Sequence, residues 1–328
     1  MAILFLIVTV SLTRQLSEQT HNGGKDGPVS PQKAVYSNTM RRKALRKNTR
    51  GHHDKGESLQ PPDGPSSSLN TLIPHNLVFT HYINLLTAPS DQVHDEDVAL
   101  RRNVRNTITL HSDASVHFLT DQECLDSIGR VMGTDSPLLG FFRQETHGMY
   151  KADICRGAAL YELGGYYMDV DIQARLNVMD VIRTNTTFCT VMVHRDSNHR
   201  GNFFQAFIAS TPRNPILKRY LELFEMHYHG LLDIHGPLGV ILLRKAHDDV
   251  VGTPRHPKPY EQHGQQVELW GEVRYSRELF PDVPPPIWGE RRACHFVVVS
   301  DPKPPCVVPF YSRTKGSRMC GGSESTKT

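Results

Sequence analysis

The sequence predicts an α/β domain in which helices flank a mixed, mainly parallel sheet. From about Leu72 onward, short runs rich in β-branched and aromatic residues alternate with helical patterns, and this alternation is typical of a parallel sheet covered by helices. Hydrophobic residues make up 38% of the 328-residue chain and charged residues 22%, as in soluble globular proteins. The sequence before Leu72 lacks hydrophobic periodicity and is predicted to lie outside this domain.

The N-terminal part is predicted to be an entry signal followed by a stem. Residues 1–12, MAILFLIVTVSL, are apolar but too few to span a bilayer, so they suit a signal peptide or a shortened signal anchor. Residues 13–70 are rich in Ser, Gly, Pro and basic residues and are predicted to be a disordered stem. Residues 71–328 then form the folded domain. Entry into the secretory pathway predicts glycosylation at Asn185, in the sequon NTT.

The charge distribution argues against a nucleic-acid-binding surface. The formal net charge is +3, and six basic residues without any acid lie in residues 41–50. Without that run the balance becomes −3, so the folded domain is not basic. The run itself is predicted to be a solvated part of the stem.

Six cysteines are present and none belongs to a CxxC pair, so no structural zinc site is predicted. Cys294, Cys306 and Cys320 cluster near the C-terminus, and we expect a disulfide among them. Cys155 falls inside a helical pattern and is predicted to be a buried thiol. The histidines of the HYH run at 227–229 cannot share a helix face, so no histidine metal site is predicted.

Periodicity and cap residues predict the order of strands and helices. Strands are expected at 76–83, 115–120, 166–173, 188–195, 203–210 and 294–300. Helices are expected at 95–108, 122–132, 149–163, 214–229 and 236–249, where apolar residues recur at helical spacing. Asp121 is expected to be the N-cap of the second helix. Trp270 and Trp288 are predicted to be packing residues.

The stretch GGYYMDVDIQ, residues 164–173, holds the most informative polar residues. If its middle runs extended, alternation puts Tyr167, Asp169 and Asp171 on one side and apolar residues on the other. Two carboxylates this close repel each other, so they must face water at a strand end or hold a cation. Oxygen ligands of this kind suit Mg²⁺ or Mn²⁺, which keep coordination positions for substrate phosphates.

The preceding helix carries a second pair of charges. Asp153 and Arg156 are three residues apart and therefore share a face of the helix predicted at 149–163. The two side chains can pair with each other as a structural element, or both can point to a ligand. The spacing alone leaves these two interpretations open.

Taken together, residues 151–173, KADICRGAALYELGGYYMDVDIQ, resemble the sugar-binding region of family 32 glycosyltransferases. This group includes yeast initiating α-mannosyltransferases and vertebrate α-1,4-galactosyltransferases, and its active region is similar to that of clostridial toxin glucosyltransferases. Weaker similarity extends over residues 72–245. The resemblance implies a GT-A-like fold and a metal-dependent, retaining transfer of a hexose from a UDP- or GDP-linked donor to a glycan, glycolipid or glycoprotein. It also implies a Golgi or other secretory-pathway location, with type II membrane attachment through the N-terminus.

The resemblance also implies roles for individual residues. Asp171 would ligate Mn²⁺ or Mg²⁺ on the donor diphosphate, and Asp169 would contact the donor and reach the metal, directly or through water. Asp153 and Arg156 would bind hydroxyls of the donor sugar and complete the catalytic set. Around them the resemblance places Thr80 and His81 beside the base, Tyr167 beside the nucleotide, Gly164 and Gly165 at a turn near the ligand, and Gly236 and Pro237 near the acceptor.

The chain departs from the family pattern near its C-terminus. Family members often end with a histidine-containing GSW segment that helps to complete the metal site, whereas here Arg318 follows Gly316 and Ser317. A non-catalytic module that binds a sugar nucleotide or a glycan is therefore an alternative. A metal phosphohydrolase fits poorly, because its DxD nucleophile follows an apolar run rather than GGYYM. The acceptor is expected among loops at residues 253–290.

Overall fold

One mixed sheet of ten strands organises the part of the chain that the structure describes. The structure is a computed structural model, and it describes residues 71–195, 199–253, 257–284, 295–300 and 307–313. In sheet order the strands are β2 (Ser115–Leu119), β1 (Asn76–Thr80), β3 (Gly165–Met168), β6 (Phe203–Ser210), β5 (Phe188–Met192), β8 (Gln265–Arg274), β9 (His295–Val299), β10 (Phe310–Arg313) and β4 (Gln173–Ala174), while β7 (Pro259–Gln262) pairs with β8.

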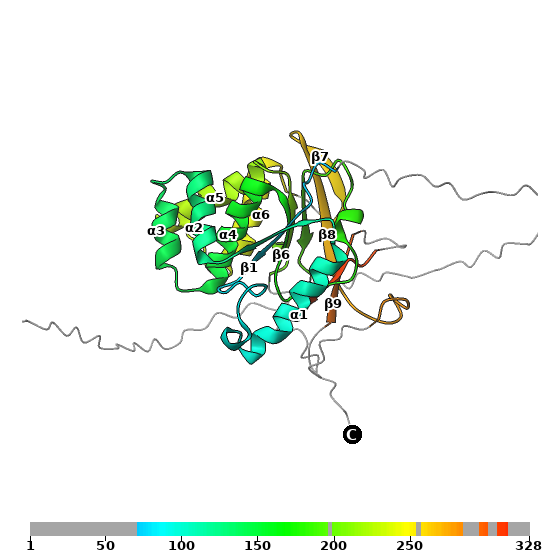
Figure 1. Ribbon diagram of the computed structural model, residues 1–328. Coiled ribbons are helices and arrows are strands. Elements are labelled where there is room, and N and C mark those ends of the chain that lie inside the picture. The colour runs from blue at the N-terminus through cyan, green and yellow to red at the C-terminus, as the bar shows by residue number, and fades with distance from the viewer. Residues whose placement is uncertain (1–70, 196–198, 254–256, 285–294, 301–306, 314–328) are drawn as a thin grey trace, which may run out of the picture. The chain divides into compact units, whose positions relative to one another are not determined.

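Helices cover both faces of this sheet. Along the chain they are α1 (Asp95–Leu110), α2 (Asp121–Met132), α3 (Pro137–Gln144), α4 (Gly148–Leu163), α5 (Pro215–Tyr228) and α6 (Leu238–Val250). Helices α2 to α6 gather on one side of the strands, and α1 lies apart from them (Figure 1). Successive strand residues point to opposite faces of the sheet and so enter two hydrophobic cores. Val78 and Tyr167 belong to the core packed against helices α2 to α6, and Phe79 and Tyr166 belong to the core that includes Val104 of α1.

The described sheet is less parallel than the sequence predicted. The pairs β1–β2, β1–β3 and β5–β8 are parallel, and the other six described pairs are antiparallel. Several antiparallel neighbours, such as β7 and β8, follow each other after short connections, which cannot hold the crossover that a parallel pair needs. The predicted α/β class, with a mixed sheet flanked by helices, is nevertheless confirmed.

The five helices expected from periodicity are confirmed within two residues, but α3 and the strands β7, β8 and β10 were not predicted. Strand β8 falls in the segment expected to hold acceptor loops, and it pairs with β5, β7 and β9. Its buried Glu268 and Glu272 hid the strand pattern. Glu268 accepts hydrogen bonds from the Thr186 hydroxyl (2.9 Å) and the Trp270 indole (2.9 Å). Trp270 is a packing residue, as predicted, and stacks on Phe207.

The first turn of α2 corrects the predicted cap. Thr120, not Asp121, is the N-cap, and it forms a capping box with Glu123. The carboxylate of Glu123 accepts the Thr120 backbone N–H at 2.9 Å. Asp121 is instead the first residue of the helix, where its charge is favourable to the helix dipole.

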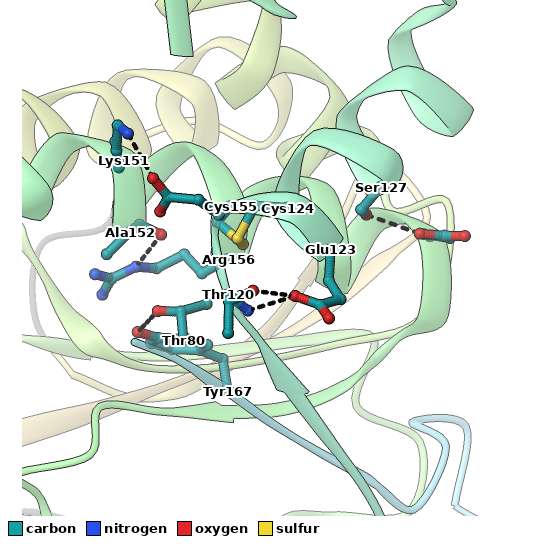
Figure 2. Close-up of a disulfide and its surroundings, with 12 residues drawn as sticks. Thr80, Thr120, Glu123, Cys124, Ser127, Lys151, Ala152, Cys155, Arg156 and Tyr167 are labelled. Carbon is teal, nitrogen blue, oxygen red and sulfur yellow. Dashed lines mark hydrogen bonds and ion pairs between the residues drawn. A yellow bond between two sulfur atoms is a disulfide. The ribbon is translucent and has the colours of Figure 1, made fainter. Parts of the chain in front are cut away.

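A disulfide joins Cys124 of α2 to Cys155 of α4, so the prediction that Cys155 is a buried thiol is wrong. Figure 2 shows the bridge lying between the two helices. Sequence spacing missed it because the partners are 31 residues apart and meet only when the helices pack. The disulfide expected among Cys294, Cys306 and Cys320 lies outside the described residues.

The N-terminal predictions also lie outside the described residues. Residues 1–70, which hold the expected signal segment and stem, are not among them. Among the residues that are described, none of the helices combines the length and apolar character needed to cross a bilayer.

The disulfide is expected to stabilise the fold. Replacing both Cys124 and Cys155 by serine should lower the free energy of unfolding by about 3–4 kcal/mol, because the bridge constrains the unfolded chain. Urea denaturation followed by circular dichroism measures the difference. Reductant should lower the unfolding midpoint of the wild-type protein more than that of the double variant; equal unfolding midpoints for the two untreated proteins would contradict a bridge at this position.

His111 connects the end of α1 to the short helix η2 (Val178–Asp180). The Val178 backbone N–H donates to Nε2 (3.0 Å), and Nδ1 lies 2.7 Å from the Thr107 carbonyl. An amide N–H can only donate, so the ring is neutral and carries its proton on Nδ1. Burial lowers the pKa of His111, although the hydrogen bond to Thr107 opposes that shift.

The contribution of His111 to the free energy of unfolding is expected to fall as the pH drops below about 6.5, because the unfolded chain takes a proton that folded His111 resists. Buried Asp153, whose pKa is raised, contributes a slope of the opposite sign, so the effect of His111 is the difference between wild type and variant. Chemical denaturation between pH 7 and pH 5 measures the slope. His111→Leu should reduce it, whereas His235→Gln, whose side chain is 91% exposed in the folded state, should retain it. Equal slopes for wild type and His111→Leu would contradict this account.

Candidate functional site

Strand β3 ends at Met168, and Asp169 and Asp171 lie on the turn that follows it. The Ile172 backbone N–H donates to the Asp169 carbonyl (3.1 Å), which closes the turn. The predicted extended run through Ile172 is therefore wrong. The two carboxylates belong to a turn at a strand end and do not share one face of a strand.

Asn103, in the middle of α1, holds this turn in place. Its side-chain amide donates to the Val170 carbonyl (2.8 Å) and to the Ile172 carbonyl. Asn103 is buried, and the two carbonyls flank Asp171. One amide therefore fixes the backbone on both sides of the residue that was predicted to ligate a metal.

The Arg156 guanidinium is the centre of the polar cluster. Its Nη2 lies 3.2 Å from Asp153 Oδ1, and its Nη1 lies 3.3 Å from Asp169 Oδ1. Its Nε also donates to the Ala152 carbonyl (3.1 Å). Only 4% of the Arg156 side chain is exposed, so carboxylates and carbonyls replace water around the charge. The Asp153–Arg156 ion pair is thus formed, and the same arginine also reaches the turn.

Tyr167 connects Arg156 to the end of β1. The guanidinium lies over the Tyr167 ring, 4.5 Å from its centre. Burial holds the pKa of Tyr167 well above its ordinary value, and its hydroxyl donates to Asp169 Oδ1 (2.5 Å). The Tyr167 hydroxyl oxygen also lies 3.0 Å from the Thr80 hydroxyl, and Thr80 is left as the donor in that contact because the Tyr167 proton goes to Asp169. Figure 2 shows Arg156, Tyr167 and Thr80 together.

Asp153 lies against the first turn of α6. The Gly239 backbone N–H donates to its carboxylate, and burial raises the pKa of Asp153 to about 7 while Arg156 opposes that shift. A Cβ at Gly239 would stand 2.0 Å from Asp153 Oδ2. Only glycine therefore allows the helix to come this close to the carboxylate.

Gln205 on β6 connects Arg156 to the first turn of α6. Its backbone carbonyl accepts from Arg156 Nη1, and its side-chain amide donates to the Gly239 carbonyl (2.9 Å). The Tyr220 hydroxyl donates to Gln205 Oε1 (3.1 Å). Both side chains are buried, so the positions of Arg156 and α6 are set by one connected network.

The predicted glycines lie at close approaches within the protein. A Cβ at Gly164 would meet Pro212 at 2.6 Å, and one at Gly165 would meet the Asn76 carbonyl oxygen at 2.4 Å; both glycines have positive φ. They let the chain turn from α4 into β3 beside β1. Gly236 and Pro237 precede α6, and the Gly236 carbonyl accepts the Tyr150 hydroxyl (3.2 Å).

A cavity of about 380 Å³ opens beside this cluster. It lies at the carboxyl ends of the parallel strands β1 and β2, where ligands of α/β sheets commonly bind. Its lining includes Thr80, His81, Thr120, Asp121, Lys151 and Cys155. Thr80 belongs both to the cavity and to the hydrogen bonds that lead to Asp169, so the cavity and the turn are parts of one region.

Asp169 and Asp171 supply the oxygen ligands that suit a divalent cation. The Asp169 side chain is 31% exposed, and its Oδ1 contacts both the Tyr167 hydroxyl and Arg156 Nη1. Within the described residues no group of three His, Cys, Asp or Glu is placed to hold a metal ion. Mg²⁺ is usually bound by one or two carboxylates together with substrate phosphates, so this pair fits a site that a substrate completes. Gly316 and Ser317 lie outside the described residues.

Comparison with known proteins identifies the same region. Residues 97–189 match the family model of the glycosyltransferase sugar-binding region containing a DXD motif. This match confirms the predicted resemblance and the prediction of a glycosyltransferase enzyme. Among solved structures, the PaToxG glycosyltransferase is 15% identical, with a TM-score of 0.38 over 54% of this chain and 68% of that chain, a likeness too weak to assign residues. No curated protein matches the chain.

Sequence reasoning brought Asp153, Arg156, Tyr167 and Asp169 together correctly but missed the residues that position them. Asn103, Gln205 and Gly239 all lie in ordinary helical or strand patterns. The sequence offered one signal: Asn103 and Gln205 are polar, although the helix and strand patterns predict that their positions are buried. The individual roles predicted for the site residues stay predictions.

The close approach of α6 to Asp153 predicts that Gly239→Ala is destabilising. The new methyl group would overlap the carboxylate, and overpacking of this kind lowers the free energy of unfolding by about 1–3 kcal/mol. Gly140→Ala in α3 is the matched control, because its Cβ would meet nothing within 4 Å. Thermal and urea denaturation compare the two; equal stability of both variants would contradict the contact.

Proposed function

We propose that this protein, whose residues 97–189 carry the sugar-binding region of DXD glycosyltransferases, moves a hexose from a UDP- or GDP-linked donor to a glycan, glycolipid or glycoprotein. The proposed cofactor is Mn²⁺ or Mg²⁺. The observation that carries this proposal is the buried cluster in which Arg156 joins Asp153 to Asp169. Buried charges beside a cavity are typical of a functional site.

The cavity is the proposed place of the nucleoside. It is concave, and its walls mix apolar groups such as Phe142 with polar groups such as Thr80 and Lys151, as small-molecule sites do. The capping box of Thr120 and Glu123 satisfies backbone N–H groups at the N-terminus of α2, and Asp121 places a second acidic side chain there. That end of the cavity therefore suits a neutral base and ribose better than a phosphate.

The turn of Asp169 and Asp171 is the proposed place of the diphosphate. Two carboxylates repel a diphosphate unless a divalent cation lies between them, and such a cation, when bound, stabilises the charge that develops on the leaving group. Asn103 holds the backbone around Asp171, so this carboxylate is positioned before the ligand arrives. Arg156 adds a fixed positive charge on the protein side.

The donor sugar is proposed to meet Asp153 and Arg156. A carboxylate accepts hydrogen bonds from sugar hydroxyls, and a guanidinium donates to their oxygens. Both side chains are almost fully buried, so the protein sets the geometry of the pair. Retention of configuration rests on the family resemblance.

The proposed place of action is the lumen of the Golgi or another secretory compartment, with attachment to the membrane through the N-terminal segment. The Cys124–Cys155 disulfide supports this proposal, since disulfides persist in oxidising compartments and are rare in the cytosol. The apolar residues 1–12 support it as well.

Release of nucleotide from a donor panel tests the proposal. The full chain is incubated with UDP-glucose, UDP-galactose, UDP-N-acetylglucosamine and GDP-mannose, each with Mn²⁺, Mg²⁺ or a chelator, and with Asp171→Asn as the inactive comparison. Metal-dependent release from one donor, lost in the variant, supports a transferase. Metal-dependent nucleotide binding without release supports the non-catalytic alternative. The absence of both nucleotide release and nucleotide binding would contradict the proposal.

The shape of the Arg156 contacts predicts that Arg156→Lys impairs donor use. A lysine keeps the charge but cannot place separate N–H groups toward both Asp153 and Asp169, so kcat/KM for the donor should fall by about a hundredfold. Arg130→Lys is the matched control, because Arg130 pairs with Glu162 at an exposed position.

Steady-state kinetics and urea denaturation are measured on both variants. The loss should appear in activity per folded molecule, with unfolding still cooperative. If Arg156→Lys lowers only stability and leaves the activity of the folded fraction intact, the ion pair is purely structural.

A further inference from the structure

The cavity holds one charge pair that the proposed chemistry does not use. Lys151 of α4 places its ammonium 2.6 Å from Asp121 Oδ2, at the first residue of α2, and 5.2 Å from the centre of the Phe142 ring. All three residues line the cavity. The pair connects the same two helices as the Cys124–Cys155 disulfide, and Figure 2 shows Lys151 on the helix that carries the bridge.

Two other carboxylates near this end of α2 and the cavity are engaged by the protein, and of these only Glu145 lines the cavity. Glu145 accepts the Tyr228 hydroxyl on Oε2 (2.5 Å) and the His147 backbone N–H on Oε1 (2.8 Å). Glu123 closes the capping box with Thr120. Asp121 and Lys151 are more open: 54% of the Asp121 side chain and 22% of the Lys151 side chain are exposed. They are the charged groups best placed to meet a base.

We propose that the Asp121–Lys151 pair selects guanine, so that the donor of this enzyme is GDP-linked. This inference rests on the proposed function and names its substrate class. Guanine presents two N–H donors, at N1 and N2, next to the acceptor O6. One carboxylate can accept both N–H groups, and an ammonium beside it can donate to O6 or N7. The pair offers these groups side by side.

Uracil does not match the same pair. Its single N–H lies between two carbonyl oxygens, so Asp121 would gain one hydrogen bond while its second oxygen faces a carbonyl. Acceptors placed against acceptors lose the hydrogen bonds that both made to water. The discrimination therefore comes from Asp121, and Lys151 orients the carboxylate and supplies a donor.

Isothermal titration of the full chain with GDP and with UDP, both in Mn²⁺, tests the inference. We expect GDP to bind at least about tenfold more tightly than UDP. Asp121→Asn should weaken GDP binding by about tenfold and leave UDP binding nearly unchanged, because the asparagine NH2 group replaces one acceptor oxygen and would face a guanine N–H donor. Lys151→Gln should also reduce the preference. Asp126→Asn, an exposed position on the same helix whose carboxylate accepts from Gln122, should keep it.

The outcomes separate this inference from the proposed function. Tight binding of UDP with weaker GDP overturns the guanine preference and leaves the transferase proposal standing. If Asp121→Asn weakens the binding of GDP and UDP equally, the residue only shapes the cavity, and the guanine preference is overturned. Absence of metal-dependent binding of either nucleotide overturns the proposed function and the guanine preference with it.

Discussion

The site depends on keeping one positive charge, the Arg156 guanidinium, inside the protein. Moving such a charge out of water costs several kcal/mol unless carboxylates and hydrogen-bond acceptors replace the water. Asp153 and Asp169 supply the carboxylates, and the carbonyls of Ala152 and Gln205 supply further acceptors. Because these partners come from α4, β6 and the turn after β3, the requirement to compensate one charge joins three elements at one point.

The same constraint explains the surrounding packing. Asp153 is itself buried, and the first turn of α6 contributes the Gly239 N–H that its charge needs. Gln205 then holds α6 at this distance. On the other side of the cluster, Asn103 fixes the turn that carries Asp171. The protein therefore arranges its polar groups before a ligand binds, which is how electrostatic preorganisation lowers a barrier without rearrangement during the reaction.

Much of this site could be predicted from the sequence because its main residues lie within about 25 positions of one another. Helix spacing brought Asp153 and Arg156 to one face, and the family resemblance added Tyr167, Asp169 and Asp171, whereas the strand spacing expected for the two carboxylates was wrong. The sequence could not predict groups that arrive from distant elements. Gly239 and Gln205 reach the cluster only through sheet topology, and Cys124 meets Cys155 only when α2 packs on α4. The sheet was predicted to be too parallel, and β8 was missed because its buried glutamates break the apolar pattern.

A structure of the full chain with Mn²⁺ and a nucleotide sugar tests the central claim most directly. The account predicts that Asp171 ligates the metal, that the diphosphate lies between the metal and Arg156, and that the sugar hydroxyls meet Asp153. The base should occupy the cavity beside Thr80 and Lys151. A nucleotide bound elsewhere, or a metal held without Asp171, would contradict the claim that the buried Arg156 cluster and the Asp169–Asp171 turn form one donor site.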